Sequence, residues 1–556
     1  MKLNNYILML VCTCLLFAGC SKDLDLIPKD TISDKSFWKS AADYKLAANN
    51  LYLSLEGFAF FDLNSDMAFN TPNSTSNGTL QPSETDANWT NAYTYIRRCN
   101  NIVLKAADSP IQDDVKVYVA EAKFFRAYNY WRIFRLYGGV PLITGVLDID
   151  SEELYSPRAS RKETIDLIIK DLTEAAADLP ESKSLAAADK GRITKGAANA
   201  LKARAALFEG TWGKYRNDAD ATAYLDIAIE ASNAVINSGQ YTLYKGMAED
   251  SYRYLFIEPG DDSDECILDR RYQKDISHHS FSGNIQEGNG YLPAKKLADM
   301  YLCNDGLPIS KSPLFQGYNT PTSEYENRDP RMTMTFMTPG VMAYYPLYAD
   351  RVECWPFYPS RNPSTGYTVF KFMSEDVEGI SYLRKLNFDY HIIRYAEVLL
   401  IYAEAVFEKN GSIGNADLDK TVNVIRERVN MPVLTNDFVS ANGLDMKQEL
   451  RRERTVELAM EGVRWDDLRR WKTAETEMKE DIKGIKIKGS EWTAPIFIEG
   501  IDRNPYAQEV YQNRTDANGF IIVETGRTFD PNKHYLLPLP TKEVAINPKL
   551  EQNPGW

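Results

Sequence analysis

The residues best suited to ligand chemistry are aromatic, and many of them gather in one stretch between positions 344 and 361. Tyrosine and tryptophan rings present a flat apolar face with a polar edge. Such rings stack on the C–H face of a sugar while neighbouring polar groups bind its hydroxyls. The expected ligand contacts in this stretch are Tyr344, Tyr345, Tyr348, Trp355, Tyr358 and Arg361. Two other interpretations stay open: the rings fill a small core under a loop, or they contact a partner protein.

A second candidate segment covers residues 60–66 and continues through a polar loop to Trp89. The loop is rich in Asn, Ser and Thr, whose side chains hydrogen-bond well to hydroxyl groups. Phe61, Asp66 and Trp89 are therefore further candidate ligand contacts. Trp89 also opens an apolar stripe at helical spacing, which favours a position in the core for that ring.

No catalytic or metal-binding pattern rises above background in this chain. The four histidines form no HExxH motif, no GxSxG elbow is present, and the cysteines form no CxxC pair. Charged residues on apolar helices are expected to form structural ion pairs rather than general acids or bases. The clearest examples are Glu397, Glu453, Glu461 and Arg464.

An acidic run at residues 260–265 is the one candidate for a bound cation. Its carboxylates could coordinate calcium, but the run lacks the full spacing of an EF-hand loop. A solvated turn is the favoured interpretation. No cofactor is predicted, and a structural calcium ion remains an unsupported alternative.

The N-terminus determines the expected compartment. Lys2 precedes a short apolar run at residues 7–17, and Ala18 and Gly19 lead directly to Cys20. A basic start, a short apolar stretch and a small-residue exit are typical of a secretory signal, and the run is too short to span a bilayer. A cysteine directly after the small pair resembles a bacterial lipoprotein signal. That signal implies cleavage before Cys20 and lipidation of its thiol, although Phe17 replaces the usual Leu. The mature chain would be anchored to the membrane rather than integral.

The net charge of the chain argues against one class of partner, and its aromatic content favours another. The 556 residues carry a formal net charge of −14, and an acidic surface repels phosphate backbones, so nucleic acid is a poor partner. The chain also holds 33 Tyr, 23 Phe and 9 Trp, more rings than a core alone needs.

Helical periodicity dominates two parts of the chain, one on each side of a long irregular region. Helices are expected at 37–55, 92–107, 115–137, 161–179, 392–409, 418–429 and 446–471, and two more around 197–208 and 225–236. The last two resemble a tetratricopeptide-type hairpin, since small alanines sit where the helices would meet. We therefore expect a mostly α fold on a tetratricopeptide-like helical-repeat scaffold.

Between the helical regions the residue composition changes, because Gly, Pro, Asn and Ser become frequent. Long irregular inserts in compact chains are usually functional. The expected division is a signal peptide at 1–19, a lipidated tether at 20–36, an N-terminal scaffold at 37–244, a loop-rich insert with short strands and the candidate binding region at 245–390, a C-terminal helical part at 391–482, and an irregular segment at 483–556.

Several short strings, taken in order, match one family. They are EAKFFRA at 121–127, LYGGVPL at 136–142, PRAS at 157–160, GRITK at 191–195, RDPR at 328–331, RYAEVLL at 394–400, EGVRWDDL at 461–468 and QNPGW at 552–556. Each string alone is weak, but their order and spacing are specific. With the lipoprotein start, the chain resembles the SusD/RagB family over essentially its whole length.

The resemblance implies a function in nutrient uptake at the outer membrane, facing the cell exterior. It implies non-catalytic binding of an oligosaccharide or polysaccharide and delivery to a SusC-like TonB-dependent transporter. Three alternatives remain open: a peptide ligand, as in some members of the family, a surface glycoside hydrolase, and a pure scaffold. The family's binding aromatics vary in position among members, so no binding residue transfers by motif.

Overall fold

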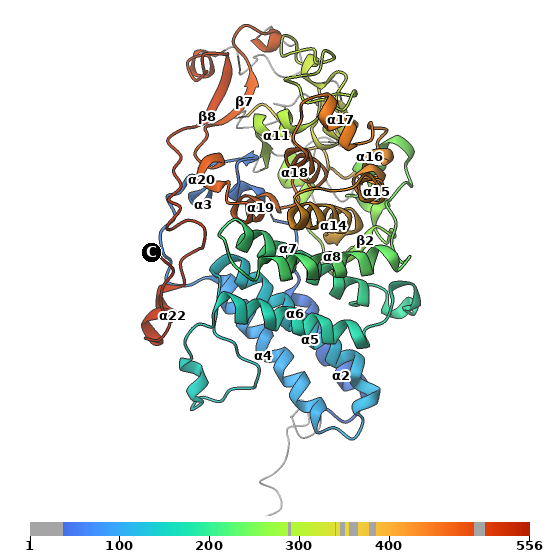
Figure 1. Cartoon of the computed structure of the whole chain (residues 1–556), viewed down its shortest axis with the longest axis vertical. Helices are drawn as coiled ribbons and strands as arrows, with labels where there is room; N and C mark the ends of the chain where they lie inside the picture. Colours follow the sequence, from blue (N-terminus) through green and yellow to red (C-terminus); the bar gives the residue numbers. More distant parts are fainter. Residues whose placement is uncertain are drawn as a thin grey trace, which may run out of the picture.

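The computed structural model describes residues 37–59, 61–286, 291–339, 341–344, 351–354, 365–376, 385–493, 506 and 508–556. Helices form the frame of this part of the chain, and its strands are short (Figure 1). None of the described helices combines the length and the apolar character that crossing a bilayer requires.

The frame begins with a stack of long helices in the N-terminal half. They are α2 (Ala41–Leu51), α4 (Ala87–Ala107), α5 (Gln112–Tyr137), α6 (Arg161–Asp178), α7 (Lys195–Lys214) and α8 (Ala221–Asn237). From α4 onward each helix packs on the next in chain order, and α14 (Tyr395–Asn410) then packs on α8. The stack therefore continues across the insert. This arrangement confirms the expected mostly α, tetratricopeptide-like scaffold.

Close packing in the stack follows from the residue types of its helices. Nearly every side chain of α5 beyond Ala120 is buried, because α4 and α6 cover its opposite sides. Arg126 is buried there only because both its nitrogens Nε and Nη2 bind Asp171 of α6 at 2.7 Å. On α7, a Cβ atom at Gly210 would lie 2.9 Å from the Leu225 side chain of α8, so glycine permits the close approach of these two helices.

The C-terminal helices that follow α14 are short. They are α15 (Asn415–Lys420), α16 (Val422–Arg428), α17 (Asn436–Ala441), α18 (Met446–Glu457), α19 (Arg464–Arg470), α20 (Ala474–Glu477), α21 (Glu509–Gln512) and α22 (Thr541–Ile546). The single helix expected at 446–471 is wrong, because the chain turns between α18 and α19. Met460 and Gly462 have φ values of 65° and 82° there, and left-handed residues cannot continue an α-helix. The helix expected at 418–429 is likewise divided, at Thr421.

Short strands pair within the insert and in the segments before and after it. Antiparallel pairs join β1 (Ala68–Phe69) to β3 (Leu292–Pro293), β2 (Cys266–Arg270) to β6 (Tyr390–Arg394), β4 (Val341–Tyr344) to β5 (Arg351–Cys354), and β7 (Ile482–Lys486) to β8 (Phe520–Glu524). The β2–β6 pair closes the insert at its neck, and it corrects the start of the helix expected at 392–409: residues 390–394 are a strand. Small helices complete the region: α3 (Ser74–Asn77), α9 (Ser251–Tyr254), α10 (Phe281–Gln286), α11 (Lys295–Met300) and α12 (Pro330–Thr335).

The C-terminal segment returns along the N-terminal helices, as the red trace from β8 to α22 shows in Figure 1. Asn553 donates hydrogen bonds to the carbonyl oxygens of Tyr137 and Leu537 at 3.1 and 2.7 Å. The Trp556 indole nitrogen donates to the carbonyl oxygen of Leu536 at 3.0 Å. The terminal string QNPGW thus fastens the chain end to the first half of the molecule.

Candidate functional site

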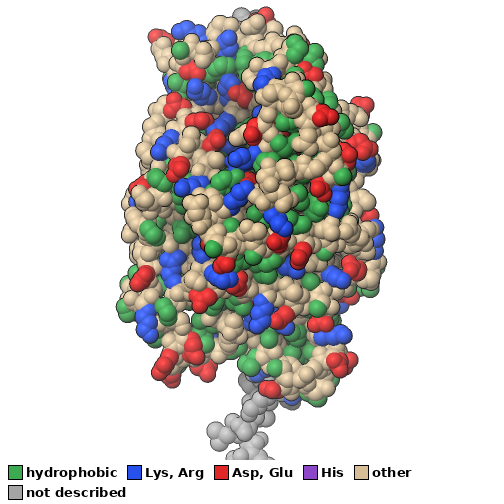
Figure 2. Space-filling view, viewed as in Figure 1, with side chains coloured by type: hydrophobic (Ala, Val, Ile, Leu, Met, Phe, Trp, Pro, Cys, Tyr) green, Lys and Arg blue, Asp and Glu red, His purple; other side chains and the backbone are tan. Residues whose placement is uncertain are grey.

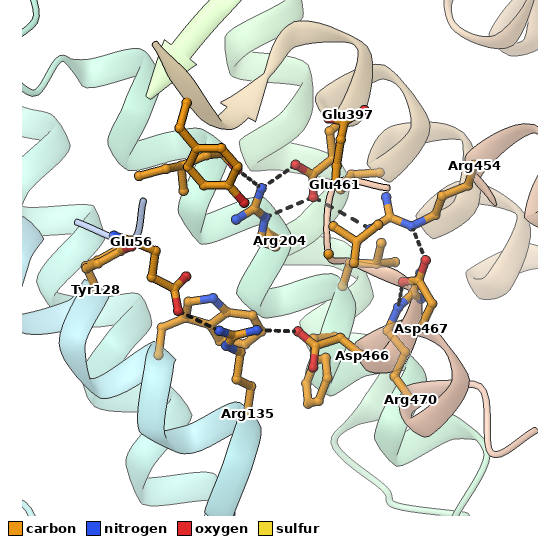
Figure 3. Close-up of a pocket in the computed structure, with 18 residues that line it drawn as sticks. Glu56, Tyr128, Arg135, Arg204, Glu397, Arg454, Glu461, Asp466, Asp467 and Arg470 are labelled. Atoms are coloured by element: carbon orange, nitrogen blue, oxygen red, sulfur yellow. Dashed lines mark hydrogen bonds and ion pairs between the residues drawn. The ribbon is translucent and has the colours of Figure 1, made fainter. Parts of the chain in front are cut away.

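A cavity of about 60 Å³, lined largely by paired charges, lies where helices of the two halves of the chain meet (Figure 3). Arg135 of α5 donates to Glu56 at 2.8 Å and to Asp466 of α19 at 3.1 Å. Arg204 of α7 binds Glu397 of α14, with its Nε 2.9 Å from the carboxylate. Each pair joins two separate elements.

A second group of charges continues the network behind this cavity. Asp467 accepts hydrogen bonds at 2.9 Å from the Nε atoms of both Arg454 and Arg470. Arg470 then binds Glu404 of α14 through Nη2 at 2.7 Å. Figure 3 shows Arg454 and Arg470 converging on Asp467 from two sides.

Guanidinium groups hold two carboxylates of this charge network, Glu56 and Glu404, as anions. Burial by itself would raise the pKa of Glu56, but the guanidinium groups of Arg135 and Arg132 outweigh burial and lower it. The same opposition lowers the pKa of Glu404 to about 2, with Arg470 as the main cation. A general acid needs a raised pKa in an accessible cleft. The network therefore suits a structural joint rather than proton transfer.

The expected ion pairing of conspicuous helix charges is confirmed at all four positions. Glu397 binds Arg204, Glu453 binds Arg331 and Arg426, Glu461 binds Arg394 and Lys371, and Arg464 binds Asp66.

Asp66 lies at one end of a polar groove of about 410 Å³. Its side chain is 2 % exposed, and its oxygens accept from Arg464 Nε and Lys296 Nζ, each at 2.9 Å. Burial opposes ionisation here, yet these two cations hold the pKa of Asp66 well below its usual range. The other polar or aromatic groups that line the groove are Lys295, Asp299, Glu480, Asp481, Lys483, Asp516, Asn518 and Phe520. Figure 2 shows Lys and Arg side chains gathered over the part of this face where β7, β8 and α11 lie.

Trp89 lies in the first turn of α4 and is 5 % exposed. Its ring packs against Tyr93 and, edge on, against Tyr137 of α5. The edge of the ring also borders a second groove of about 410 Å³ between α4 and α22. The structure therefore places Trp89 in the wall of the helical scaffold. Trp89 and Asp66 line different grooves.

The main aromatic candidates fall on the hairpin β4–β5 and on the residues around it. Tyr344 ends β4 opposite Arg351, the first residue of β5. The other candidates of this stretch, Tyr345, Tyr348, Trp355, Tyr358 and Arg361, lie outside the described residues, as does Cys20. Phe61 begins a short 3-10 helix, Phe61–Asn64, and only its backbone is described.

Comparison with known protein families finds two matches, which together cover most of the chain. A model described as "SusD family" matches residues 263–556, more than half of the chain. The chain belongs to the SusD family. A second model, described as "Starch-binding associating with outer membrane", matches residues 36–207.

Individual relatives extend the similarity of this SusD-family chain across its full length. A SusD-like protein of Formosa agariphila is 27 % identical over 527 residues, covering 88 % of this chain and 95 % of its own. A SusD-like protein of Bacteroides ovatus is 24 % identical and covers 99 % of this chain and 98 % of its own.

Solved structures agree with the fold. A SusD-like carbohydrate-binding protein of Bacteroides fragilis superimposes with a TM-score of 0.73 at 25 % identity, covering 93 % of this chain and all of that one. Another SusD-like protein of the same organism gives a TM-score of 0.75 at 26 % identity, with 95 % of this chain and all of that one covered.

One aromatic cluster of this SusD-family chain was missed in the sequence. The half-buried Phe58 stacks on Phe281 at 4.6 Å between ring centres and contacts His279 at 4.3 Å and Tyr390 at 5.0 Å. Three distant segments supply these rings, so no spacing pattern marks them. Burial lowers the pKa of His279 to about 4, and the neutral ring accepts from the Phe281 backbone N–H at 3.2 Å.

The acidic run at 260–265 is bound by cationic side chains. Asp262 contacts Arg271 at 2.8 Å, and Glu265 contacts Arg394 at 2.9 Å and Arg428 at 3.0 Å. Its carboxylates thus have protein partners. The alternative of a calcium ion stays a prediction.

Proposed function

We propose that this chain binds a glycan outside the cell and passes it to a SusC-like TonB-dependent transporter of the outer membrane. The observation that carries the proposal is the likeness to the SusD-like carbohydrate-binding protein of B. fragilis, which extends over 93 % of the chain. The "Starch-binding associating with outer membrane" model over residues 36–207 supports the same ligand class and location.

Capture without catalysis fits the charges of the scaffold. Carboxylates held by guanidinium groups, such as Glu56 and Glu404, are poor proton donors near neutral pH. A carrier also benefits from moderate affinity, since slow dissociation would delay transfer to the transporter. The protein therefore acts by reversible binding.

The binding surface is proposed on the insert, at the hairpin β4–β5. Tyr344 ends β4, residues 345–350 connect the two strands, and Trp355 directly follows β5. Aromatic rings that loops hold over a rigid scaffold can stack on the flat face of a sugar. Phe61 and Asp66 precede the polar loop that leads to Trp89. The buried Asp66, held by Arg464 and Lys296, would support that loop.

A substitution tests the surface directly. Trp355→Ala is expected to weaken glycan binding by about 1–3 kcal/mol, the usual worth of one aromatic stacking partner. The measurement is calorimetry with a panel of oligosaccharides, chosen after a glycan array on the unaltered protein. Tyr155→Ala is the matched control, because Tyr155 is 48 % exposed on the N-terminal scaffold.

The outcomes separate the parts of the proposal. Unchanged affinity in Trp355→Ala removes the hairpin as the site but leaves glycan binding intact. Binding of peptides with no glycan response would overturn the ligand class, and new reducing ends in polysaccharide digests would overturn non-catalytic capture. Cys20→Ala should move the protein out of the outer-membrane fraction if Cys20 is the lipidated residue.

A further inference from the structure

Three side chains of metal-binding type meet where β2 pairs with β6. Cys266 and Asp269 of β2 and His391 of β6 each offer one ligand atom, and these atoms all lie within 4.8 Å of one another. The Cys266 Sγ is 3.3 Å from His391 Nδ1, and Asp269 Oδ1 is 2.9 Å from the same nitrogen. Strand pairing alone creates this group, because His391 is far from the other two residues in sequence.

An irregularity in the strand pairing explains how Cys266 and Asp269 reach one side. Residues three apart on a regular strand point to opposite faces of the sheet. Here Asp269 is opposite His391 while Cys266 is opposite Arg394, and the register shifts on both sides of Leu268. Bulges of this kind re-aim side chains and often lie at functional sites.

The orientation of His391 is that of a metal ligand. Its Nε2 lies 2.8 Å from the carbonyl oxygen of Leu255, which can only accept, so Nε2 carries the hydrogen. In the neutral ring, the lone pair of Nδ1 then faces the Asp269 carboxylate, while the Cys266 sulfur lies over the face of the ring, 3.3 Å from Nδ1 and 3.8 Å from Nε2. Metal-binding histidines typically donate their second ring N–H to a carbonyl or carboxylate in this way. Either a proton on Nδ1, which makes an imidazolium–carboxylate pair with Asp269, or a metal ion compensates these three electron-rich atoms.

Distances and access suit one particular ion. Zinc binds thiolate sulfur at about 2.3 Å and imidazole nitrogen or carboxylate oxygen at about 2.0–2.2 Å, so donors in a tetrahedral site lie roughly 3.3–3.6 Å apart. The two separations given above are within a few tenths of an ångström of that range. His391 is 6 % exposed, and Cys266 and Asp269 line a cavity of about 280 Å³ that can supply solvent.

We propose that Cys266, Asp269 and His391 bind one zinc ion, with water from the adjoining cavity as the fourth ligand. The ion pins β2 to β6, the pair that closes the neck of the insert. Its role is structural, and it does not depend on the ligand that the insert binds. The thiol has two further polar neighbours, the Ser263 hydroxyl at 3.3 Å and the Gly260 carbonyl oxygen at 3.7 Å. To reach the ion, the sulfur must rotate away from these neighbours and from the face of the His391 ring.

The test uses the full mature chain, stripped with a chelator and titrated with Zn²⁺ and, separately, with Co²⁺. One equivalent of Zn²⁺ should bind and raise the thermal midpoint, because a ligand that binds only the folded state stabilises it. Co²⁺ should produce the visible bands of a tetrahedral ion together with a near-ultraviolet thiolate-to-cobalt charge-transfer band.

Variants assign the site. Cys266→Ser and His391→Gln should each lower Zn²⁺ affinity at least roughly tenfold, by the scale of losses known even for groups behind the ligands. Cys303→Ser is the control, because this buried free cysteine lies elsewhere in the fold. Circular dichroism checks that each variant is folded, and Cys266→Ala replaces any variant that is not. Two results would overturn the proposal: a zinc response in Cys266→Ser equal to that of the unaltered chain, or a cobalt complex with no thiolate band. Either result would mean that His391 and Asp269 form an imidazolium–carboxylate pair without a metal ion.

Discussion

Buried ion pairs are the feature that distinguishes this molecule at the scale of single residues. The most enclosed group joins three carboxylates to four guanidinium groups, namely Glu265, Glu453, Glu457, Arg331, Arg394, Arg426 and Arg428. A buried pair adds little net stability over apolar packing, but the loss of one partner leaves a charge without compensation. These residues hold five separate segments in one arrangement, and any single neutral substitution is expected to be costly.

Glu404 allows this cost to be measured together with its pH dependence. Glu404→Gln removes one of the two anions that the buried Arg470 binds and should lower the free energy of unfolding by about 3–5 kcal/mol at pH 7. The folded pKa of Glu404 is about 2, below its ordinary 4.5, so its stabilising contribution is complete above pH 4.5 and is lost as the pH falls toward 2. Urea unfolding from pH 7 to pH 3 measures both effects.

Glu427→Gln is the matched control for that experiment, because the Glu427 side chain is 72 % exposed in its pair with Lys245. It should change stability by no more than about 0.5 kcal/mol. An equally small change in Glu404→Gln would mean that the network around α14 does not contribute to the stability of the fold.

At the scale of elements, helix ends follow from local backbone chemistry that apolar spacing does not report. The apolar stripe from Val456 to Val463 suggested one continuous helix, yet the chain leaves the helix after Glu457 and resumes at Arg464. The Gly462 N–H donates to Asp62 at 2.9 Å in this turn, a partner from the other end of the sequence. Sequence spacing predicted the existence and type of most helices, and tertiary hydrogen bonds determined where several of them stop.

Gly210 tests the packing of two such elements. Gly210→Ala adds a methyl group against Leu225 on the facing helix α8, and overpacking of this kind costs about 1–3 kcal/mol. The better helix propensity of alanine returns at most about 1 kcal/mol, so a net loss of stability is expected. Gly145→Ala is the control, since no atom lies within 4 Å of the added Cβ atom. A Gly210→Ala protein more stable than its parent would show that α7 and α8 can move apart freely.

At the scale of the whole molecule, the chain is closed twice by contacts between distant segments. The β2–β6 pair closes the insert, and the C-terminal string binds back to α5 and its following loop. The strand pair closes through backbone hydrogen bonds and the C-terminal string through the Asn553 side chain, so the scaffold holds the loop-built insert in a defined position relative to the helical stack. This is the mechanical requirement for a binding surface made of loops.

Asn553 tests the second closure. Asn553→Ala removes its hydrogen bonds to Tyr137 and Leu537 and leaves two buried carbonyl oxygens without that partner, which should cost about 1–3 kcal/mol. Hydrogen exchange should accelerate throughout the C-terminal segment, beyond the mutated residue. Asn513→Ala, an exposed position on the same segment, serves as the control. Unchanged exchange in Asn553→Ala would show that the terminal string is not the fastening.

The sequence by itself determined the helical class of this protein, its family resemblance and the expected ion pairing of residues such as Glu397 and Glu461. Helical periodicity and the order of motifs are local or one-dimensional signals, so they can be recognised in the sequence without knowledge of the fold. Only the tertiary structure decided that Asp66 lies under Arg464 and Lys296, that Phe58 meets rings from three segments, and that Cys266 faces His391. Those groupings arise from strand register and helix packing between residues hundreds of positions apart, which no spacing along the chain encodes.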